Sequence, residues 1–282
     1  MPIMKLKTGI ELYYDEWGDG DKVVLSARNQ PSRINNYTID MAEMGFHVYN
    51  IQLRGYGKSS PVTEEFGEKW YDVWSGDLCD FADRIGCERF IYTGQSHGAG
   101  VGWLTCYYHP ERVKAFIGVV AGPHIRNGEE TGASRIATIE AASSPEKWKA
   151  YCDGRITRLR DRAEKCTDPE KRAVLLAQTE EAADFWYNMK PASALINPHK
   201  PFAWCKTEEE LVKELRTINV PVLLFGGMKD EVSPPAALLR SCGAVRDSKL
   251  ILYEAAGHGL SADKKEDMLS DIRSWCTVRG FL

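Results

Sequence analysis

The stretch Phe90-Ile91-Tyr92-Thr93-Gly94-Gln95-Ser96-His97-Gly98 decides the fold of this chain. Its first four residues form a short apolar run typical of a buried strand, and a helical stretch follows from Gly98 to Tyr108, with Pro110 just beyond. Ser96 therefore lies at the apex of a sharp strand-to-helix turn. Glycines on either side let the backbone pass closely without Cβ clashes. This arrangement, G-x-S-x-G between a strand and a helix, predicts an exposed nucleophilic serine whose helix N-terminus favours an oxyanion.

Short apolar runs on both sides of this stretch predict a sheet that helices cover on both faces. Helical stretches between them, such as residues 72–85, give the alternation of a doubly wound, mostly parallel α/β sheet. Residues 5–7 and 10–14 alternate as an antiparallel hairpin does, and a single amphipathic helix is expected over residues 262–275. The expected parallel strands are residues 23–25, 47–51, 90–93, 115–120, 220–225 and 249–253.

The strand-and-helix pattern breaks after Gly122-Pro123. A polar, helix-rich stretch without a strand signal then continues to about Trp204. A crossover between parallel strands needs about a dozen residues, and this connection is several times longer. We therefore expect an inserted helical cap at 123–206, between a first core segment at 1–122 and a second at 207–282.

The composition of the chain argues against two classes of binding partner. The 282 residues suit one α/β domain or a core with an insertion, and the net charge is only −4. No basic tract appears, which argues against nucleic acid and anionic membrane surfaces. No apolar run approaches the length of a membrane-spanning helix, and no apolar stretch typical of a signal peptide follows Met1.

The cysteines predict the compartment. Eight are scattered along the chain without a C-x-x-C pair. In a chain of this size without an expected secretion signal, this pattern indicates reduced thiols and a cytoplasmic protein. Scattered histidines without i, i+4 pairing predict no metal site, and no cofactor is expected.

Two further residues complete the chemistry that Ser96 needs. Asp230 follows one expected strand and His258 follows the next, so both lie at carboxyl ends of parallel strands, where open α/β sheets place ligands. The chain order Ser, Asp, His is that of hydrolases with a nucleophile elbow. A histidine with a pKa of about 6.5 can accept the serine proton and return it to a leaving group. Glu231 is the alternative acid.

With these residues in place, the core segments resemble the capped α/β-hydrolase family. Four landmarks match in order, and residues 109–113 also resemble the segment after the elbow helix. The landmarks are Arg54-Gly55-Tyr56-Gly57-Lys58-Ser59, Gly94 to Gly98, Gly227-Met228-Lys229-Asp230 with Pro234, and Gly257-His258. The resemblance implies an α/β-hydrolase fold with Ser96 as nucleophile, His258 as base and Asp230 as the acid that orients it. It does not extend to the cap.

The loop after the first parallel strand departs from the family. Relatives usually have His-Gly there, next to the second donor of the oxyanion hole, whereas this chain has Ser26-Ala27-Arg28-Asn29-Gln30-Pro31. By position, the backbone N–H of Asn29 or of Arg28 would join that of His97 as the oxyanion hole. Removing one such donor typically lowers the rate by about a hundred- to a thousandfold, so the loop should still supply one.

Four side chains are candidates for substrate binding. The guanidinium of Arg28 could hold a substrate carboxylate in a bidentate pair, with a solvated or salt-bridged arginine as the alternative. His124 follows a strand at the entry to the cap and could line the pocket. Trp186 and Trp204 could form part of an apolar pocket under the cap, with helix packing as the alternative for each.

The expected activity is hydrolysis of a small-molecule substrate. The family resemblance makes a carboxylic ester or lactone the commonest substrate, cleaved through an acyl-enzyme on Ser96. Amide, thioester and C–C bond hydrolysis use the same triad, and a non-catalytic small-molecule receptor is a further alternative. An aspartate at position 96 would have suggested epoxide hydrolase or dehalogenase chemistry. The sequence leaves open whether the chain forms a homo-oligomer.

Overall fold

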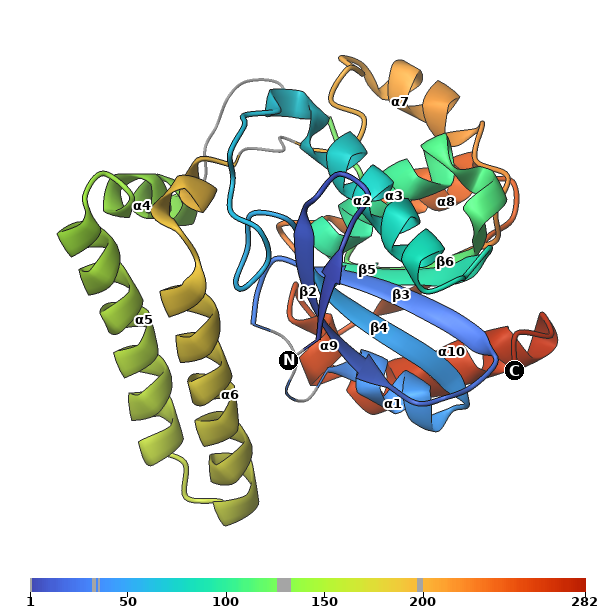
Figure 1. The fold of residues 1–282 in the computed structure, drawn as a ribbon. Coiled ribbons are helices and arrows are strands. Elements are labelled where there is room, and N and C mark those ends of the chain that lie inside the picture. Colours follow the sequence, from blue (N-terminus) through green and yellow to red (C-terminus); the bar gives the residue numbers. More distant parts are fainter. Residues whose placement is uncertain (1, 32–33, 35, 126–132, 197–199) are drawn as a thin grey trace.

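A single eight-stranded sheet forms the centre of the protein (Figure 1). The computed structural model describes residues 2–31, 34, 36–125, 133–196 and 200–282. The strand order is β1-β2-β4-β3-β5-β6-β7-β8. Strand β2 is antiparallel to both of its neighbours, β1 and β4, and all pairs among β3 to β8 are parallel. The predicted hairpin and mostly parallel sheet are thereby confirmed. The strands are β1 Ile3–Lys5, β2 Glu11–Trp17, β3 Lys22–Arg28, β4 Phe46–Gln52, β5 Phe90–Gln95, β6 Val113–Val119, β7 Val222–Gly227 and β8 Ser248–Tyr253.

Helices cover both faces of this sheet, as Figure 1 shows. One face carries α2 (Trp70–Arg84), α3 (His97–Tyr108) and α8 (Pro235–Ala244), with α7 (Glu208–Leu215) packed on α8. The other face carries α1 (Tyr37–Glu43) and α10 (Lys265–Val278), joined to the sheet through the short α9 (Leu260–Asp263). Three-residue or five-residue 3₁₀ turns lie at Gly67–Lys69, Pro110–Arg112 and Pro191–Leu195.

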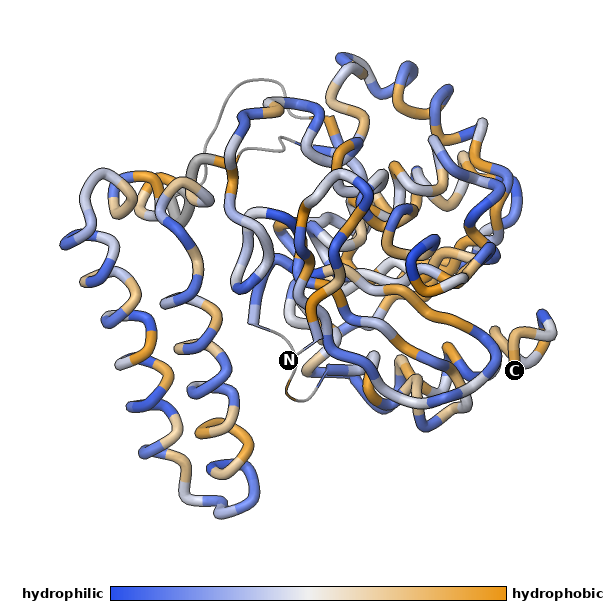
Figure 2. Tube along the Cα trace, viewed as in Figure 1, coloured by the Kyte–Doolittle hydropathy of each residue, from blue (hydrophilic) through white to orange (hydrophobic). Residues whose placement is uncertain are grey.

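Apolar side chains hold each helical layer to the sheet. All six residues of β7 are buried, as a strand covered on both faces requires. Trp74 and Trp103 lie in the core on the α2–α3 face, and Met41 and Ile272 lie in the core on the α1–α10 face. Burying a large apolar side chain stabilises a fold by about 1.5–3 kcal/mol. Figure 2 shows this pattern as continuous apolar colour in the middle of β3.

The segment between β6 and α7 is helical, as expected. It contains α4 (Ala133–Ala141), α5 (Pro145–Glu164) and α6 (Pro169–Asn188), and no strand occurs in its described residues. Side chains of Ser144 and Asp168 cap α5 and α6, each followed by a proline at the first helical position. The α5–α6 pair stands beside the sheet and its layers, with more hydrophilic colour than the strands (Figures 1 and 2).

Several boundaries differ from the sequence prediction, and two of these differences have a clear local cause. The expected helix over residues 262–275 is two helices, because Lys264 adopts φ −131° and ψ 31° and separates α9 from α10. The strand expected from Val220 begins at Val222 instead. Pro221 precedes it and has no N–H to donate to a neighbouring strand. Among the described residues, no helix combines the length and apolarity needed to cross a bilayer.

Thiol accessibility gives a first test of this fold. All eight cysteines are free, and the five buried ones are Cys79, Cys106, Cys152, Cys205 and Cys276. Burial raises the pKa of Cys79 to about 12 and that of Cys276 to about 11, so little reactive thiolate forms. We expect an aromatic disulfide reagent to label three thiols rapidly in the native protein and all eight in denaturant. The absorbance of the released aromatic thiolate counts the labelled cysteines. Rapid labelling of more than three cysteines in the native protein would contradict this packing.

Candidate active site

Ser96 occupies the strained turn that the sequence predicts. Its backbone has φ 51° and ψ −114°, a conformation that L residues rarely adopt. Two hydrogen bonds hold the turn: the N–H of Ser96 donates to the carbonyl of Val119 at 3.0 Å, and the carbonyl of Ser96 accepts from Gly100 at 3.0 Å. Backbone strain of this kind destabilises the folded state by about 1–3 kcal/mol. It persists where the surrounding structure enforces it, often at functional sites.

The flanking glycines are required by close backbone approach. A Cβ on Gly94 would lie 2.5 Å from the carbonyl carbon of Gly98, and a Cβ on Gly98 would lie 2.2 Å from the carbonyl oxygen of Ala27. Both separations are shorter than any tolerated contact. The second one shows that the first turn of α3 lies directly against the end of β3.

His258 joins Ser96 to Asp230. The Nε2 atom of His258 lies 3.0 Å from Oγ of Ser96, and its Nδ1 atom lies 2.9 Å and 3.1 Å from the two carboxylate oxygens of Asp230. The structure therefore brings together the three side chains that the sequence singled out. They come from the loops after β5, β8 and β7, which end at one edge of the sheet.

The environments of the acid and the histidine differ. The side chain of Asp230 is fully buried, whereas one third of the His258 side chain is exposed. Backbone N–H groups of Val232 and Ser233 donate to Oδ1 of Asp230 at 2.8 Å and 2.9 Å. These charge-assisted bonds offset the burial of a carboxylate. Asp230 is consequently fixed in place, whereas part of the His258 ring remains open to solvent.

Gln95 is part of this site, and the sequence analysis missed it. Its Nε2 atom donates to the backbone carbonyl of His258 at 3.3 Å, and its Oε1 atom accepts from the hydroxyl of Ser261. One side chain beside the serine thus holds the loop that carries the histidine. Its position inside the G-x-S-x-G motif was the available signal, but the motif specifies no residue there.

The sequence predicts the N–H groups of Asn29 and His97 as the oxyanion donors, and both residues follow strands that pair in the sheet. In the parallel pairing of β3 with β5, Ser26 is opposite Thr93, so Asn29 and Ser96 each lie three residues beyond the same rung. His97 is the first residue of α3, where N–H groups have no carbonyl partner within the helix. The His97 side chain is hydrogen-bonded through Nδ1 to the hydroxyl of Tyr71 at 2.8 Å.

The guanidinium of Arg28 has two carboxylate partners within the chain. Its Nη2 atom lies 2.5 Å from Asp15, its Nη1 atom lies 3.0 Å from Glu181, and the side chain is only 6% exposed. This arrangement matches the salt-bridged alternative rather than a free clamp for a substrate carboxylate, because both terminal nitrogens are already occupied.

The other three candidates for substrate binding have different surroundings. His124 is half-buried after β6, with Nδ1 3.2 Å from the carbonyl oxygen of Gly122. Trp186 is 5% exposed and is packed inside the helical pair, under the guanidinium of Arg155 at 4.2 Å. Only His124 therefore lies beyond a strand that ends at the site.

Trp204 is positioned away from Ser96. Its ring packs on those of Tyr107 and Tyr108, at the last turn of α3. Ser96 precedes the first turn of the same helix, and 11 residues of helix correspond to about 16 Å. The expectation that Trp204 lines the substrate site does not fit this placement. The physical reason is that Trp204 joins an aromatic cluster at the far end of the helix.

Comparison with known proteins places the chain in a family. A family-wide sequence model described as the alpha/beta hydrolase fold matches residues 30–265. The chain belongs to the α/β hydrolase fold family. Of the described residues, no group of three or more His, Cys, Asp or Glu side chains in this α/β hydrolase could hold a metal ion.

Individual relatives of this α/β hydrolase are distant. The bifunctional epoxide hydrolase 2 of Sus scrofa is 31% identical over 39% of this chain, and the matched region is only 20% of that protein's length. The bifunctional esterase/perhydrolase DCH of Acinetobacter calcoaceticus is 23% identical over 97% of this chain and 100% of its own. The enol-lactonase of Burkholderia xenovorans LB400 has the same fold, with a TM-score of 0.72 at 19% identity, covering 98% of this chain and 100% of that one.

Proposed function

We propose that the protein is a serine hydrolase that cleaves a small carboxylic ester or lactone through an acyl-enzyme on Ser96. One observation carries the proposal: Ser96, His258 and Asp230 form an unbroken chain of hydrogen bonds at one edge of the sheet. A nucleophile, a base and an acid that orients the base are the parts that acyl transfer to serine requires.

The reaction proceeds in two steps. The Oγ atom of Ser96 attacks the substrate carbonyl while Nε2 of His258 takes its proton, and Asp230 stabilises the imidazolium through Nδ1–H. Backbone N–H groups of Asn29 and His97 bind the oxyanion of the tetrahedral intermediate. His258 then protonates the leaving alkoxide, and water repeats the sequence on the acyl-enzyme. The free acid leaves, and Ser96 regains its proton.

The proposed substrate class has two supports. Ser96 stands at the position where an aspartate would favour opening of an epoxide, so the partial match to an epoxide hydrolase does not set the chemistry. Relatives that cover nearly the whole chain carry the names esterase/perhydrolase and enol-lactonase. The words esterase and lactonase name the cleavage of esters and of lactones, which are cyclic esters.

We also propose that residues 123–206 act as a cap over the site. The segment leaves the sheet after β6, which ends at the same edge as the strands that position Ser96 and Asp230. Its helices α5 and α6 stand beside the sheet and the helices that cover it (Figure 1). His124, at the entry to the segment, is the proposed substrate contact. Eight free cysteines support a reducing compartment, and we propose the cytoplasm.

A panel of activated esters tests the proposed function. The protein is incubated with p-nitrophenyl acetate and butyrate, an aliphatic γ-lactone and an anilide. A fluorophosphonate reports the nucleophile by mass spectrometry. Turnover of esters or lactones with phosphonylation at Ser96 is the expected result. Turnover of the anilide alone would contradict the ester proposal, and binding without turnover or labelling would favour a receptor.

Gln95 gives a second prediction about this activity. We expect Gln95→Leu to lower kcat/KM for p-nitrophenyl acetate by about tenfold. The loop that carries His258 loses the hydrogen bonds that anchor it, and a small displacement of a reacting group lowers the rate strongly. Gln95→Glu keeps the acceptor for Ser261 but loses the donor to the carbonyl of His258. Its kcat/KM should lie between the values of the wild type and of Gln95→Leu. Equal activity of all three proteins, with equal thermal stability, would show that the anchor is dispensable.

A further inference from the structure

A buried ionic cluster joins the core to α6. The guanidinium of Arg28, at the end of β3, lies between the carboxylates of Asp15 on β2 and Glu181 on α6. Arg28 and Asp15 are each 6% exposed as side chains, and Glu181 is 14% exposed. In so little water such ion pairs are strong only while every partner is present, because a lone buried charge is unfavourable.

Glu181 also binds a second point of the same loop. Its Oε2 atom accepts a hydrogen bond at 2.9 Å from the backbone N–H of Ile34, while its Oε1 atom faces Arg28 at 3.0 Å. One carboxylate therefore contacts Arg28, which precedes Asn29, and Ile34, which follows it in the chain. Because the two donors face different oxygens, a side chain that presents only one acceptor oxygen in this position leaves one of the two donors unpaired.

The backbone of Arg28 is fixed from the opposite side. Its carbonyl accepts from the N–H of Leu53 at 2.9 Å, which continues the β3–β4 pairing by one residue. Its Nε atom is buried and has no hydrogen-bond partner among the described residues, where Asp15 and Glu181 are the carboxylates that hold the guanidinium. Removing Glu181 would take away one of these two described partners.

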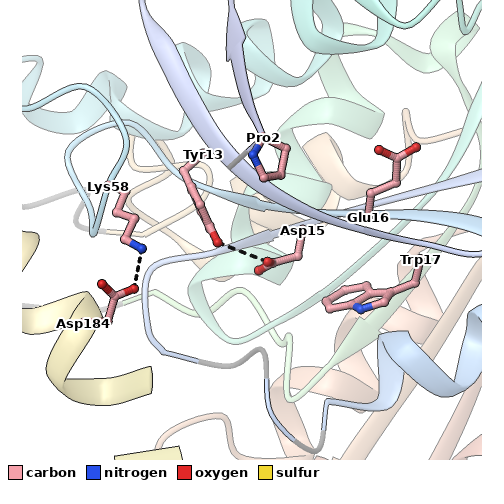
Figure 3. A pocket seen from close by; sticks show the side chains of 7 residues that line it. All are labelled: Pro2, Tyr13, Asp15, Glu16, Trp17, Lys58 and Asp184. Atoms are coloured by element: carbon pink, nitrogen blue, oxygen red, sulfur yellow. Dashed lines mark hydrogen bonds and ion pairs between the residues drawn. The ribbon is translucent and has the colours of Figure 1, made fainter. Parts of the chain in front are cut away.

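A second contact attaches α6 to the core close by. Lys58 Nζ lies 2.6 Å from Asp184, and the two line a cavity of about 300 Å³ together with Asp15 and Tyr13 (Figure 3). The hydroxyl of Tyr13 donates to Asp15 across this cavity. Asp184 is 53% exposed, and its partner Lys58 lies outside the loop that begins with Asn29. These two acids of α6 thus differ: Asp184 attaches the helix, whereas Glu181 reaches Arg28 and Ile34.

We propose that Glu181 is a positioning residue that aligns the oxyanion donor of Asn29 from the helical segment at 123–206. The inference rests on the proposed function, because an oxyanion forms only if Ser96 attacks a carbonyl. Glu181 acts through Arg28 and Ile34 and touches no reacting atom. It fixes residues on both sides of Asn29 in a loop that lacks the usual His-Gly. The rate of the chemical step therefore depends on one side chain of α6, Glu181, and not on the Lys58–Asp184 contact.

The test separates positioning from general stability. Glu181→Gln has the same shape but one acceptor oxygen, so it cannot satisfy Arg28 and Ile34 together. We expect its kcat for p-nitrophenyl acetate to fall by about ten- to a hundredfold, since a misplaced oxyanion donor acts on the transition state. KM should stay within about twofold, and affinity for an alkyl boronic acid, which occupies the oxyanion site, should fall in parallel with kcat.

Matched variants make the result specific. Glu180→Gln makes the same chemical change at the neighbouring exposed position, and Asp184→Asn removes the acid of α6 that pairs with Lys58. Both should retain wild-type kcat. Glu181→Asp keeps the buried charge but reaches only one partner, so an intermediate kcat is expected even if Glu181→Gln folds poorly. Titration with a fluorophosphonate gives the active fraction, so kcat is expressed per competent site.

Two outcomes would overturn the inference while leaving the proposed function intact. One is a wild type that hydrolyses the ester and a Glu181→Gln variant with the same kcat per active site. The other is an equal loss in Glu180→Gln or Asp184→Asn. A wild type that hydrolyses no ester and is not phosphonylated overturns the proposed function itself, and the inference with it.

Discussion

Replacing Ser96 with alanine is expected to lower kcat for p-nitrophenyl acetate by about 10⁴-fold or more, because the acyl-enzyme can no longer form. The change deletes one oxygen that lies 3.0 Å from Nε2 of His258. Alanine and serine tolerate φ 51° equally badly, so the turn keeps its strain and the fold should be retained. Any residual rate would come from the oxyanion donors acting on water attack.

The control for this variant is a serine away from the site. Ser143 is exposed in the turn before α5, and Ser143→Ala should retain wild-type kcat. Circular dichroism and thermal unfolding should give the same values for both variants as for the wild type. Ester turnover by Ser96→Ala within tenfold of the wild type would mean that another group performs the attack.

Asp230→Asn is expected to lower kcat by about 10⁴-fold, nearly as much as loss of the nucleophile. The asparagine oxygen can still accept from the N–H groups of Val232 and Ser233. Its amide nitrogen then faces Nδ1 of His258 and donates to it. The proton of the imidazole moves to Nε2, and the ring can no longer accept the proton of Ser96.

The neighbouring acid provides the matched comparison for Asp230. Glu231 is exposed, and Glu231→Gln should leave kcat unchanged. The value of kcat/KM for p-nitrophenyl acetate, measured for all three proteins at one pH, should fall only in Asp230→Asn. A large effect in Glu231→Gln with none in Asp230→Asn would transfer the orienting role to the second acid.

The residues proposed for chemistry were predictable because each follows a strand directly. Ser96, Asp230 and His258 lie just past β5, β7 and β8, and parallel strands bring their carboxyl ends to one edge whatever the loops contain. The sheet itself was predictable for a similar reason. Its strands are apolar on both faces, a local pattern that needs no knowledge of distant partners.

Long-range contacts were the part that sequence could not supply. Arg28 meets Asp15 at a separation of 13 residues and Glu181 at a separation of 153, and no local pattern pairs them. Trp204 joins a cluster with Tyr107 and Tyr108, nearly a hundred residues earlier in the chain. In each case the partner is set by how helices dock on the sheet, which depends on the tertiary fold.

The ion pair between β3 and α6 also limits how this enzyme could be re-engineered by exchange of segments. Transplanting residues 123–206 from another hydrolase would remove Glu181 and leave Arg28 with a single counter-charge in a dry environment. A successful chimera must either bring an acid to that turn of its second long helix or replace Arg28 and Asp15 together. We therefore expect an exchange of this segment to change the rate of the chemical step together with any change in substrate range.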